Sequence, residues 1–367
     1  MQKKLIALAV AAALIPAAAM ADTGNVTVYG LMSMDFDNVR SSNVNTVAAP
    51  ISNNLNRVTN NATRLGFKGT EDLGGGLKTI WQLEMLADAN GNAGNGLGGA
   101  IRNSNVGLAG SGGTVFYGMW DTPFKVAHNK LEMFDNAAFA STIDLLGRTS
   151  NTGVNFNNRL KNSVNYWTPD IGGFQAKLAY GTDNAKASVP VATATNMRVL
   201  SFSGTYENDM LYAAYAYEKF NDASGTGAAS LNSDQKGNRL VGAFKFPNGQ
   251  VGLTYERLNN DTVAVASTSR NAWELAGTYK MGASNLGAAY VRANDVTNTT
   301  GTGAKQYSLR YGYNFSKRTE VYGMYSHISN DVGANYNFSV NTASSAVAGS
   351  IAGASLSGLG LGIMHSF

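Results

Sequence analysis

"GLGLGIMHSF", residues 358–367, ends the sequence and alternates in character from one residue to the next. Successive side chains of an extended strand point to opposite faces, so Leu359, Leu361, Ile363, His365 and Phe367 share one face of a predicted strand. The other face carries glycines, a methionine and a serine. Because chain ends usually fray in water, an aromatic last residue raises the question of which surroundings favour its ring.

Composition favours turn-rich β structure. Charged residues make up only 14% of the chain and hydrophobic residues 44%, with 42 glycines and 10% aromatic residues. This profile differs from that of a disordered chain or a helix-rich enzyme, and 367 residues suit one large β-barrel. The absence of cysteine excludes a disulfide framework, a thiol nucleophile and a cysteine metal site.

The first 21 residues, "MQKKLIALAVAAALIPAAAMA", have the pattern of an export signal. Two lysines precede an apolar core, Pro16 interrupts it, and small residues precede a predicted cleavage after Ala21. A membrane anchor is disfavoured because the apolar run is too short to span ~30 Å of hydrocarbon. The mature chain, residues 22–367, keeps 26 basic residues against 24 acidic ones, which argues against a nucleic-acid partner.

The alternation seen at the end recurs throughout the mature chain, in segments such as "VTVYGLMSMDFD", "RLVGAFKF" and "KQYSLRYGYNF". Later segments contain no run of ~18 apolar residues, so a helical membrane protein is not expected. The pattern predicts sixteen strands, near 25–36, 62–71, 77–88, 101–109, 114–120, 160–168, 173–181, 197–206, 209–220, 238–246, 250–258, 270–280, 285–293, 305–313, 318–327 and 355–367.

The connections between these strands alternate in length. Short turns such as "DLGGGL", "DIGG" and "FPNG" are followed, one strand later, by long segments rich in Asn, Ser, Thr and Gly. An even number of strands, with short turns at one end and long loops at the other, is typical of an all-β, antiparallel transmembrane barrel. Closure of such a barrel leaves no unpaired backbone edge in lipid. Phe367 then lies at the membrane interface, on a last strand that closes the barrel against the first.

Several blocks carry a family resemblance: "VTVYG", "TRLGFKGTEDLGGGLKTIWQLE" (63–84), "NSNVGLAGSGGTVFYG" (103–118), "NSVNYWTPDIGGFQAKLAYG" (162–181) and "GIMHSF". In these blocks the chain resembles the general-diffusion porins of Gram-negative bacteria, in particular the neisserial and related β-proteobacterial type. The resemblance implies a homotrimeric, water-filled channel of the outer membrane that passes small hydrophilic solutes and ions. It also implies that the third external loop folds inward and narrows the pore.

Residues 121–159, which lack a clear strand pattern, are the segment suited to that constriction loop. Its acids are expected to contribute the loop side of the constriction: Asp121, Glu132, Asp135 and Asp144. Alternation places charged residues of the wall on the lumen face, where they avoid the free-energy cost of contact with lipid. The predicted pore-wall residues are Arg64, Lys68, Lys78, Glu84, Arg102 and Lys161, although alternation with Val106 would turn Arg102 outward and only the resemblance places it at the mouth.

Two departures from the family pattern bear on ion selectivity. Met119 follows "YG" where relatives commonly carry arginine, and Asn165 stands in "SVNY" where they often read "SVRY". With four acids on the loop and several bases on the wall, neither sign dominates, and the sequence predicts weak charge selectivity.

Three alternatives compete with an open diffusion pore. A substrate-preferring channel shares every feature above, and a plugged barrel would need a plug domain for which the sequence gives no sign. An outer-membrane lipase would need a histidine beside a serine at the outer rim, and "YSHIS" around His327 is the local candidate. With only three histidines in the chain, we expect no catalytic site, no metal and no cofactor.

Overall fold

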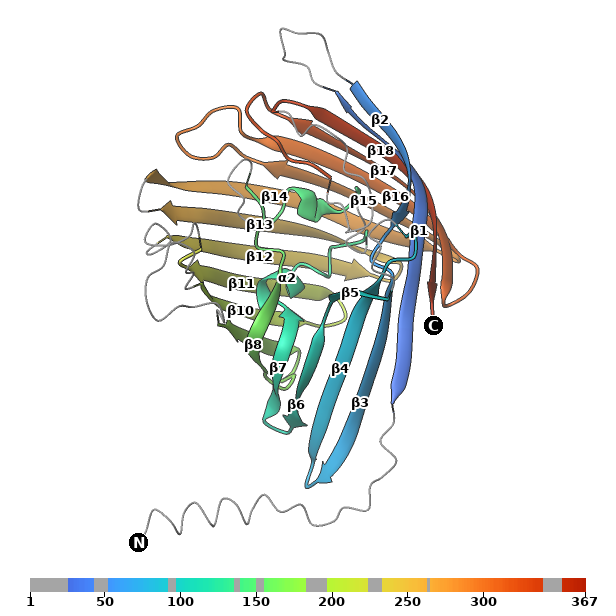
Figure 1. The fold of residues 1–367 in the computed structure, drawn as a ribbon, viewed down its shortest axis with the longest axis vertical. Helices are drawn as coiled ribbons and strands as arrows, with labels where there is room; N and C mark the ends of the chain where they lie inside the picture. Colours follow the sequence, from blue (N-terminus) through green and yellow to red (C-terminus); the bar gives the residue numbers. More distant parts are fainter. Residues whose placement is uncertain are drawn as a thin grey trace.

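The computed structural model describes residues 26–42, 52–91, 97–134, 139–149, 155–182, 197–223, 233–262, 265–338 and 352–367 (Figure 1). The predicted signal segment, residues 1–21, lies outside the described residues. Among the described residues no helix is long and apolar enough to cross a bilayer.

Most of the described chain is β-strand. The strands are β1 (Thr27–Ser42), β2 (Ser52–Asn60), β3 (Arg64–Gly74), β4 (Leu77–Ala87), β5 (Leu97–Ile101), β6 (Ser104–Gly110), β7 (Gly113–Asp121), β8 (Arg159–Trp167), β9 (Phe174–Gly181), β10 (Arg198–Glu207), β11 (Leu211–Asn221), β12 (Asp234–Phe246), β13 (Gly249–Thr262), β14 (Val265–Met281), β15 (Ser284–Ala293), β16 (Ala304–Asn314), β17 (Thr319–Asn330) and β18 (Ser355–Ser366). Two short helices, α2 (Pro123–Val126) and η1 (Thr142–Asp144), lie between β7 and β8.

These eighteen segments form one closed antiparallel sheet of sixteen wall strands. β2 and β3 both pair with β1, one after the other, and so make a single wall strand interrupted near Ala62. β5 and β6 likewise both pair with β4 and are interrupted at Arg102 and Asn103. The prediction of a sixteen-stranded barrel is confirmed.

β1 and β18 close the barrel, in register from Leu31 opposite Ser366 to Ser42 opposite Ser355. Beyond the ladder, Gly30 and Phe367 exchange two backbone hydrogen bonds of 3.0 and 3.2 Å. The ring of Phe367 lies over Gly30, where any side chain on residue 30 would collide with it. The absence of a side chain at residue 30 therefore leaves room for the Phe367 ring across the closing seam.

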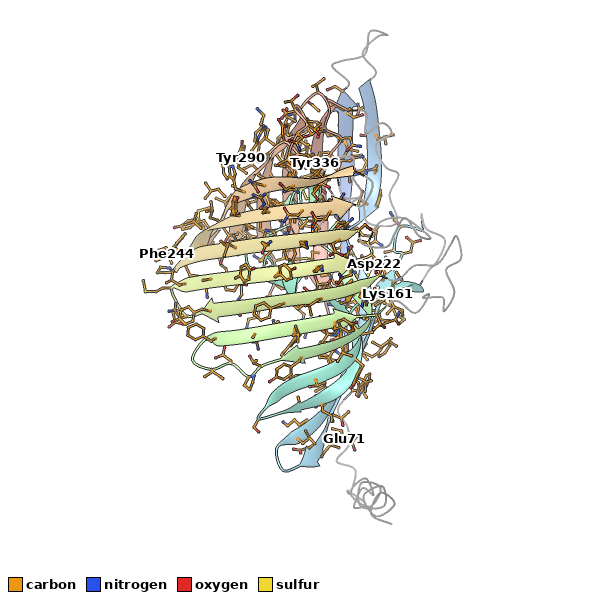
Figure 2. The ribbon with its side chains drawn as sticks, turned by 90° about the vertical axis from the view of Figure 1, so that its left-hand side faces the viewer. Glu71, Lys161, Asp222, Phe244, Tyr290 and Tyr336 are labelled. Carbon is orange, nitrogen blue, oxygen red and sulfur yellow. The ribbon has the colours of Figure 1, made fainter. Side chains whose placement is uncertain are left out.

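The two faces of the wall differ as the alternation predicts. On β18, Leu359, Leu361 and Ile363 are exposed on the outside by 60, 68 and 53%. Aromatic residues are exposed on the same outer face, among them Tyr166, Phe174, Tyr180, Tyr311 and Tyr313. Exposed apolar surface on this scale fits a lipid surrounding, with the rings as interfacial belts. Figure 2 shows the two rims, with Phe244 near the short-turn edge and Asp222 near the long-loop edge.

Strand positions agree with the sequence prediction, and the differences lie at the long-loop ends. β1 continues to Ser42, and β2 and β5 add segments that the prediction missed. "SNNLNRVTN" in β2 has polar residues on both faces. Such a segment gives no alternation signal, although its backbone pairs with β1.

Candidate functional site

The loop between β7 and β8 lies inside the curve of the sheet, where α2 is seen in Figure 1. Seven of its large apolar side chains are at most 1% exposed: Phe124, Leu131, Phe134, Phe139, Leu145, Leu146 and Phe156. The ring of Phe156 lies 5.5 Å from that of Phe124 and 5.2 Å from that of Phe220 on β11. Burial of this many aromatic and aliphatic side chains stabilises the loop against the inner wall.

Glycines on the inner wall make room for these rings. A Cβ on Gly237 would lie 3.1 Å from both Phe124 and Phe156, and one on Gly358 would lie 2.5 Å from Phe139. Gly360 is also covered by Phe139, with Cε1 and Cζ 3.0 Å from an added Cβ. The inward glycines of the terminal "GLGLG" therefore form the seat of a loop side chain, while the leucines between them face outward.

Polar groups anchor the same loop to the wall. Glu256 accepts hydrogen bonds from Arg239 and Arg270, each at 2.7 Å, and from the backbone N–H of Gly147 at 2.7 Å. Arg270 also donates to the carbonyl of Leu145 at 2.8 Å. All three charged side chains are fully buried, so they hold the loop and are withdrawn from the passage.

Further anchors extend this contact around the wall. His128 Nε2 lies 2.7 Å from Glu274 on β14, and Tyr212 of β11 donates to the carbonyl of Ala127 at 2.8 Å. Gln306 on β16 donates to the carbonyl of Ser141 at 3.1 Å. The backbone N–H of Phe124 also donates to Ser201 of β10 at 3.1 Å, so the loop is held against the wall from β10 to β18. The remaining wall faces what is left of the lumen.

That remaining wall carries a group that we call the charged cluster: Arg64, Glu84, Arg102, Asp121, Lys125 and Arg159. Glu84 accepts from Arg102 Nε at 2.7 Å and from the Tyr29 hydroxyl at 3.0 Å, with Arg64 Nε at 3.8 Å. The six side chains of the charged cluster keep 9 to 30% of their surface exposed.

The second half of the charged cluster lies at the root of the loop. Asp121 Oδ1 pairs with Lys125 at 2.7 Å and with Arg159 at 3.3 Å. Asn103, which directly follows Arg102 of the first half, donates its amide to Asp121 at 2.9 Å and accepts from Arg159 at 3.1 Å. Burial lowers the pKa of Lys125, while Asp121 opposes that shift. Four bases and two acids leave the charged cluster with two excess positive charges.

The structure places the predicted loop acids differently from one another. Asp121 belongs to the charged cluster, whereas the carboxylate of Glu132 turns back into the loop and accepts from Ser141 at 2.7 Å and from the N–H of Phe134 at 2.9 Å. Burial raises the pKa of Glu132. The expectation for Asp144 has to be corrected, because Asp144, the last residue of η1, is only 1% exposed and lies against Gln306 of β16, whose amide is 3.5 Å from its Oδ2. Asp135 lies outside the described residues.

The predicted wall residues lie in different parts of the barrel. Arg64 and Arg102 meet at Glu84, and Arg102 turns inward because the strand is interrupted beside it. Lys68 lies over the Tyr29 ring at 5.2 Å. Lys78 stands opposite Asp72 near the short turn, at the other end of β3 and β4 from Arg64 and Glu84.

Lys161 requires a second correction. β8 carries an extra residue where its pairing with β7 shifts between Gly118 and Trp120, and Asn162 adopts a positive φ of 48°. Strict alternation therefore fails at Lys161, which is exposed near the long-loop edge (Figure 2). Met119, opposite Ser104, shares the outer face of β7 with Tyr117, so an arginine there would not face the lumen.

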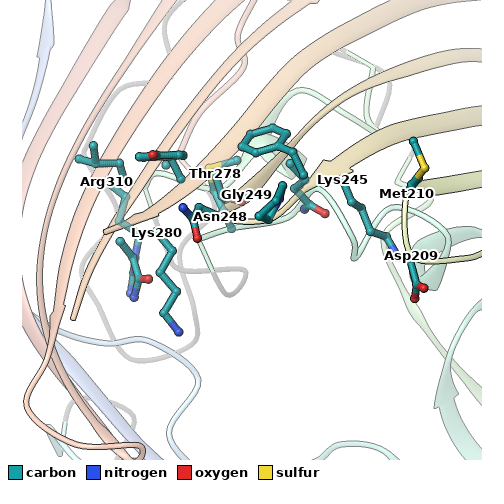
Figure 3. Close-up of a pocket in the computed structure, with 16 residues that line it drawn as sticks. Asp209, Met210, Lys245, Asn248, Gly249, Thr278, Lys280 and Arg310 are labelled. Carbon is teal, nitrogen blue, oxygen red and sulfur yellow. The ribbon is translucent and has the colours of Figure 1, made fainter. Parts of the chain in front are cut away.

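A second basic region lies toward the short turns, where alternation along β12 and β16 already turns Lys245 and Arg310 inward. A recess of about 850 Å³ is lined by Lys245, Lys280, Arg310 and Asp209, which project into it in Figure 3. Lys245 pairs with Glu207 at 2.6 Å, and Lys130 of the loop reaches the same carboxylate at 2.7 Å. Arg310 pairs with Glu320 at 2.7 Å. The loop thus directs a lysine, rather than an acid, to this part of the lumen.

The histidine named for the lipase alternative lies on the outer face. His327 stacks on Tyr307 at 5.5 Å, and its Nδ1 lies 2.8 Å from the hydroxyl of Ser357. Within the described part of the chain no carboxylate pairs with His327, so the third member of a hydrolytic triad is missing there. The described residues also contain no cluster of His, Asp and Glu suited to a metal ion.

A closed barrel with an apolar outer belt and a charged interior narrowed by its own loop defines a transmembrane channel of the outer-membrane type. The family model for the Gram-negative porins matches residues 7–333, and the chain belongs to this family. It is therefore an outer-membrane diffusion porin of a Gram-negative bacterium, and its family consists of channels rather than enzymes.

Individual relatives agree with this assignment. The chain is 28% identical over 374 residues to outer membrane porin protein 32 of Delftia acidovorans, covering 100% of both chains. It is 27% identical over 345 residues to major outer membrane protein P.IB of Neisseria sicca, covering 88% of this chain and 92% of that one. The structure of an anion-selective porin from Comamonas acidovorans matches with a TM-score of 0.77 at 24% identity, over 94% of this chain and 100% of that one, which shows the shared fold.

Proposed function

We propose that this porin is a homotrimer whose passage, narrowed by the 121–159 loop, favours small hydrophilic anions over cations of the same size. The observation that carries the proposal is the charged cluster, with four bases against two acids in side chains that stay partly exposed. Fixed charge in a confined lumen raises the local concentration of the opposite ion.

The preference for anions differs from the weak selectivity expected from the sequence. That expectation counted four loop acids, but Asp144 is buried against the wall and Glu132 is hydrogen-bonded within the loop. The loop also contributes Lys125 and Lys130, which pair at the two basic regions. The Comamonas porin of the same fold is described as anion-selective, which agrees with this direction.

Reversal potential in planar bilayers under a KCl gradient tests the proposal. At ~0.1 M salt the Debye length is ~10 Å, so the charged cluster should influence much of the passage and the potential should have the sign of anion preference. At 1 M salt, where that length is ~3 Å, the preference should decline. A potential with the sign of cation preference at low salt would contradict the proposal.

A second candidate, a channel that retains a particular anionic solute, is supported by the recess around Lys245, Lys280 and Arg310. A polyvalent organic anion added from the short-turn side should then produce resolved blocking events. Lys280→Gln should shorten those events if the recess retains the anion, whereas events of unchanged duration would leave simple diffusion as the function.

A further inference from the structure

A small polar pocket lies on the outer face of the wall, away from the lumen. It has a volume of about 410 Å³ and is lined by Arg257, Arg292, Ser269, Asn271, Asp295 and Thr297 among others. Alternation places Arg257 outside, because Tyr255 on the same face is 43% exposed whereas the intervening Glu256 is fully buried. This pocket therefore opens toward the surroundings of the barrel.

The depth of the pocket relative to the membrane follows from a row of aromatic side chains beside it. Trp273, Tyr290, Tyr307 and His327 run across β14 to β17 with ring centroids 5.2, 6.1 and 5.5 Å apart. Outward aromatic rows mark the membrane interface. Arg292 pairs directly with Trp273, and residues of the long loop after β15 complete the pocket. It thus lies on the long-loop side of the row, at the level of the outer-leaflet headgroups.

Charge at this level is distributed unevenly. Two neighbouring outer-face lysines are neutralised, Lys219 by Asp234 and Lys236 by Asp261, each at 2.8 Å. Arg257, by contrast, donates to two neutral oxygens, Asn259 Oδ1 at 3.3 Å and Ser269 Oγ at 3.2 Å. Among the described residues no carboxylate pairs with Arg257.

Arg292 adds a second guanidinium to the pocket. It reaches Asp331 at 3.2 Å and stands directly opposite Lys305 on β16. Directly opposed like charges destabilise a sheet unless an anion lies between them. The carboxylate in the pocket, Asp295, already accepts the N–H groups of Thr302 and Gly303 at 2.8 and 2.7 Å. With Lys305 counted, three basic side chains stand against two acids, Asp295 and Asp331, so one positive charge remains in excess.

We infer that this pocket binds the phosphate of an anionic lipid headgroup in the outer leaflet, with the acyl chains lying along the aromatic row. Two guanidinium groups supply the forked donors that phosphate oxygens favour, and the pocket's hydroxyl and amide groups suit a sugar or glycerol attached to that phosphate. The outward opening admits a lipid from the plane of the membrane. This binding is independent of passage through the lumen.

Native mass spectrometry of the detergent-solubilised porin tests the inference, with bisphosphorylated lipid A as the probe. The wild-type protein should retain the lipid, and the double variant Arg257→Gln with Arg292→Gln should bind it ~10- to 100-fold more weakly, because each charge-assisted contact is among the strong hydrogen bonds. The matched control, Lys317→Gln with Arg318→Gln, removes the same charge from the opposite rim and should bind as the wild type does. Unchanged single-channel conductance shows that both variants fold.

Three results would overturn the inference. Equal lipid binding by the double variant and the wild type would place the lipid elsewhere. Full competition by millimolar inorganic phosphate would make this a site for free anions. A change in oligomeric state of the double variant by light scattering, with lipid binding intact, would make the same face a contact between copies of the chain.

Discussion

The ring of Phe139 fills the space left by the missing side chain of Gly360, with Cε1 and Cζ only 3.0 Å from where a Cβ would stand. One residue belongs to the loop inside the barrel and the other to the strand that closes it. The position of the loop is therefore coupled to the identity of small residues on β18.

Replacing the neighbouring glycine should displace the loop. In Gly358→Ala the new Cβ would lie 2.5 Å from Phe139 Cδ2, and overpacking of this kind costs ~1 to 3 kcal/mol. We expect lower thermal stability and noisier single-channel current. Gly242→Ala is the control, since nothing lies within 4 Å of the added Cβ. Identical behaviour of the two variants would show that the Phe139 contact does not position the loop.

Glu256 should dominate the polar anchoring of the loop. Glu256→Gln leaves Arg239 and Arg270, both fully buried, without their shared carboxylate. Breaking a buried pair in this way costs ~3 to 5 kcal/mol. We expect a marked loss of thermal stability and faster proteolysis within residues 121–159.

The matched control for this experiment is Asp261→Asn, which removes a carboxylate from a pair whose side chains are about one-third exposed. Exposed pairs contribute ~0 to 1 kcal/mol, so this variant should melt close to the wild type. Equal destabilisation of the two variants would contradict the role assigned to Glu256.

Single charges of the charged cluster should shift selectivity in opposite directions. Arg64→Ala removes a base from the side of Glu84 and should lower the anion-to-cation permeability ratio at low salt by ~2-fold. A unit charge ~8 Å away in water contributes ~0.5 kcal/mol with opposite sign for the two ions, and screening over a Debye length of ~10 Å leaves about half of that for each. Asp121→Asn should raise the ratio by a similar factor. Reversal potentials measure both, with Lys236→Gln on the outer face as control. An unchanged potential in Arg64→Ala would place Arg64 away from the narrow zone.

The partly buried carboxyl of Glu132 predicts a pH dependence of stability. Its pKa in the folded protein is raised by burial, so its contribution is fully present below the ordinary glutamate pKa of ~4.3 and is lost as the pH rises through the raised value. Glu132→Gln, which stays neutral, should lack this component. The difference in melting temperature between variant and wild type should grow in favour of the variant from ~pH 4.3 upward, and a constant difference would refute the prediction.

Assembly can be examined directly on unheated gels and by light scattering in detergent. If the porin is a homotrimer, we expect a high-mass band that heating converts to the monomer, as well as a scattering mass of three chains. A monomeric mass under extraction conditions that preserve conductance would contradict trimer formation.

Alternation along strands made the wall predictable from the sequence. Where the backbone is regular, as along β18, each side chain lies on the predicted face. The same reasoning failed at Arg102 and Lys161, because an interruption and an extra residue reset the alternation there. Neither irregularity has an obvious signal, since residues 102–103 and 161–162 are ordinary polar residues.

The charge of the narrow zone was less predictable than the wall. Composition gives the number of acids on the loop, but their effect depends on which side of the loop meets the wall. Asp144 is covered on η1, whereas Lys125 on α2 stays beside Asp121. Arg239, inward by alternation, is covered by the loop and serves as an anchor. These outcomes depend on long-range packing that no local pattern encodes.

The closing pair of strands also has a consequence for biogenesis. β1 must find a partner more than three hundred residues further along the chain, since Leu31 lies opposite Ser366. Contacts so distant in sequence form slowly, and until they form, β1 presents an unpaired edge that invites pairing with another chain. The unpaired edge of β1 must therefore be protected from other chains between export and membrane insertion. That protection has to last until β18 pairs with β1.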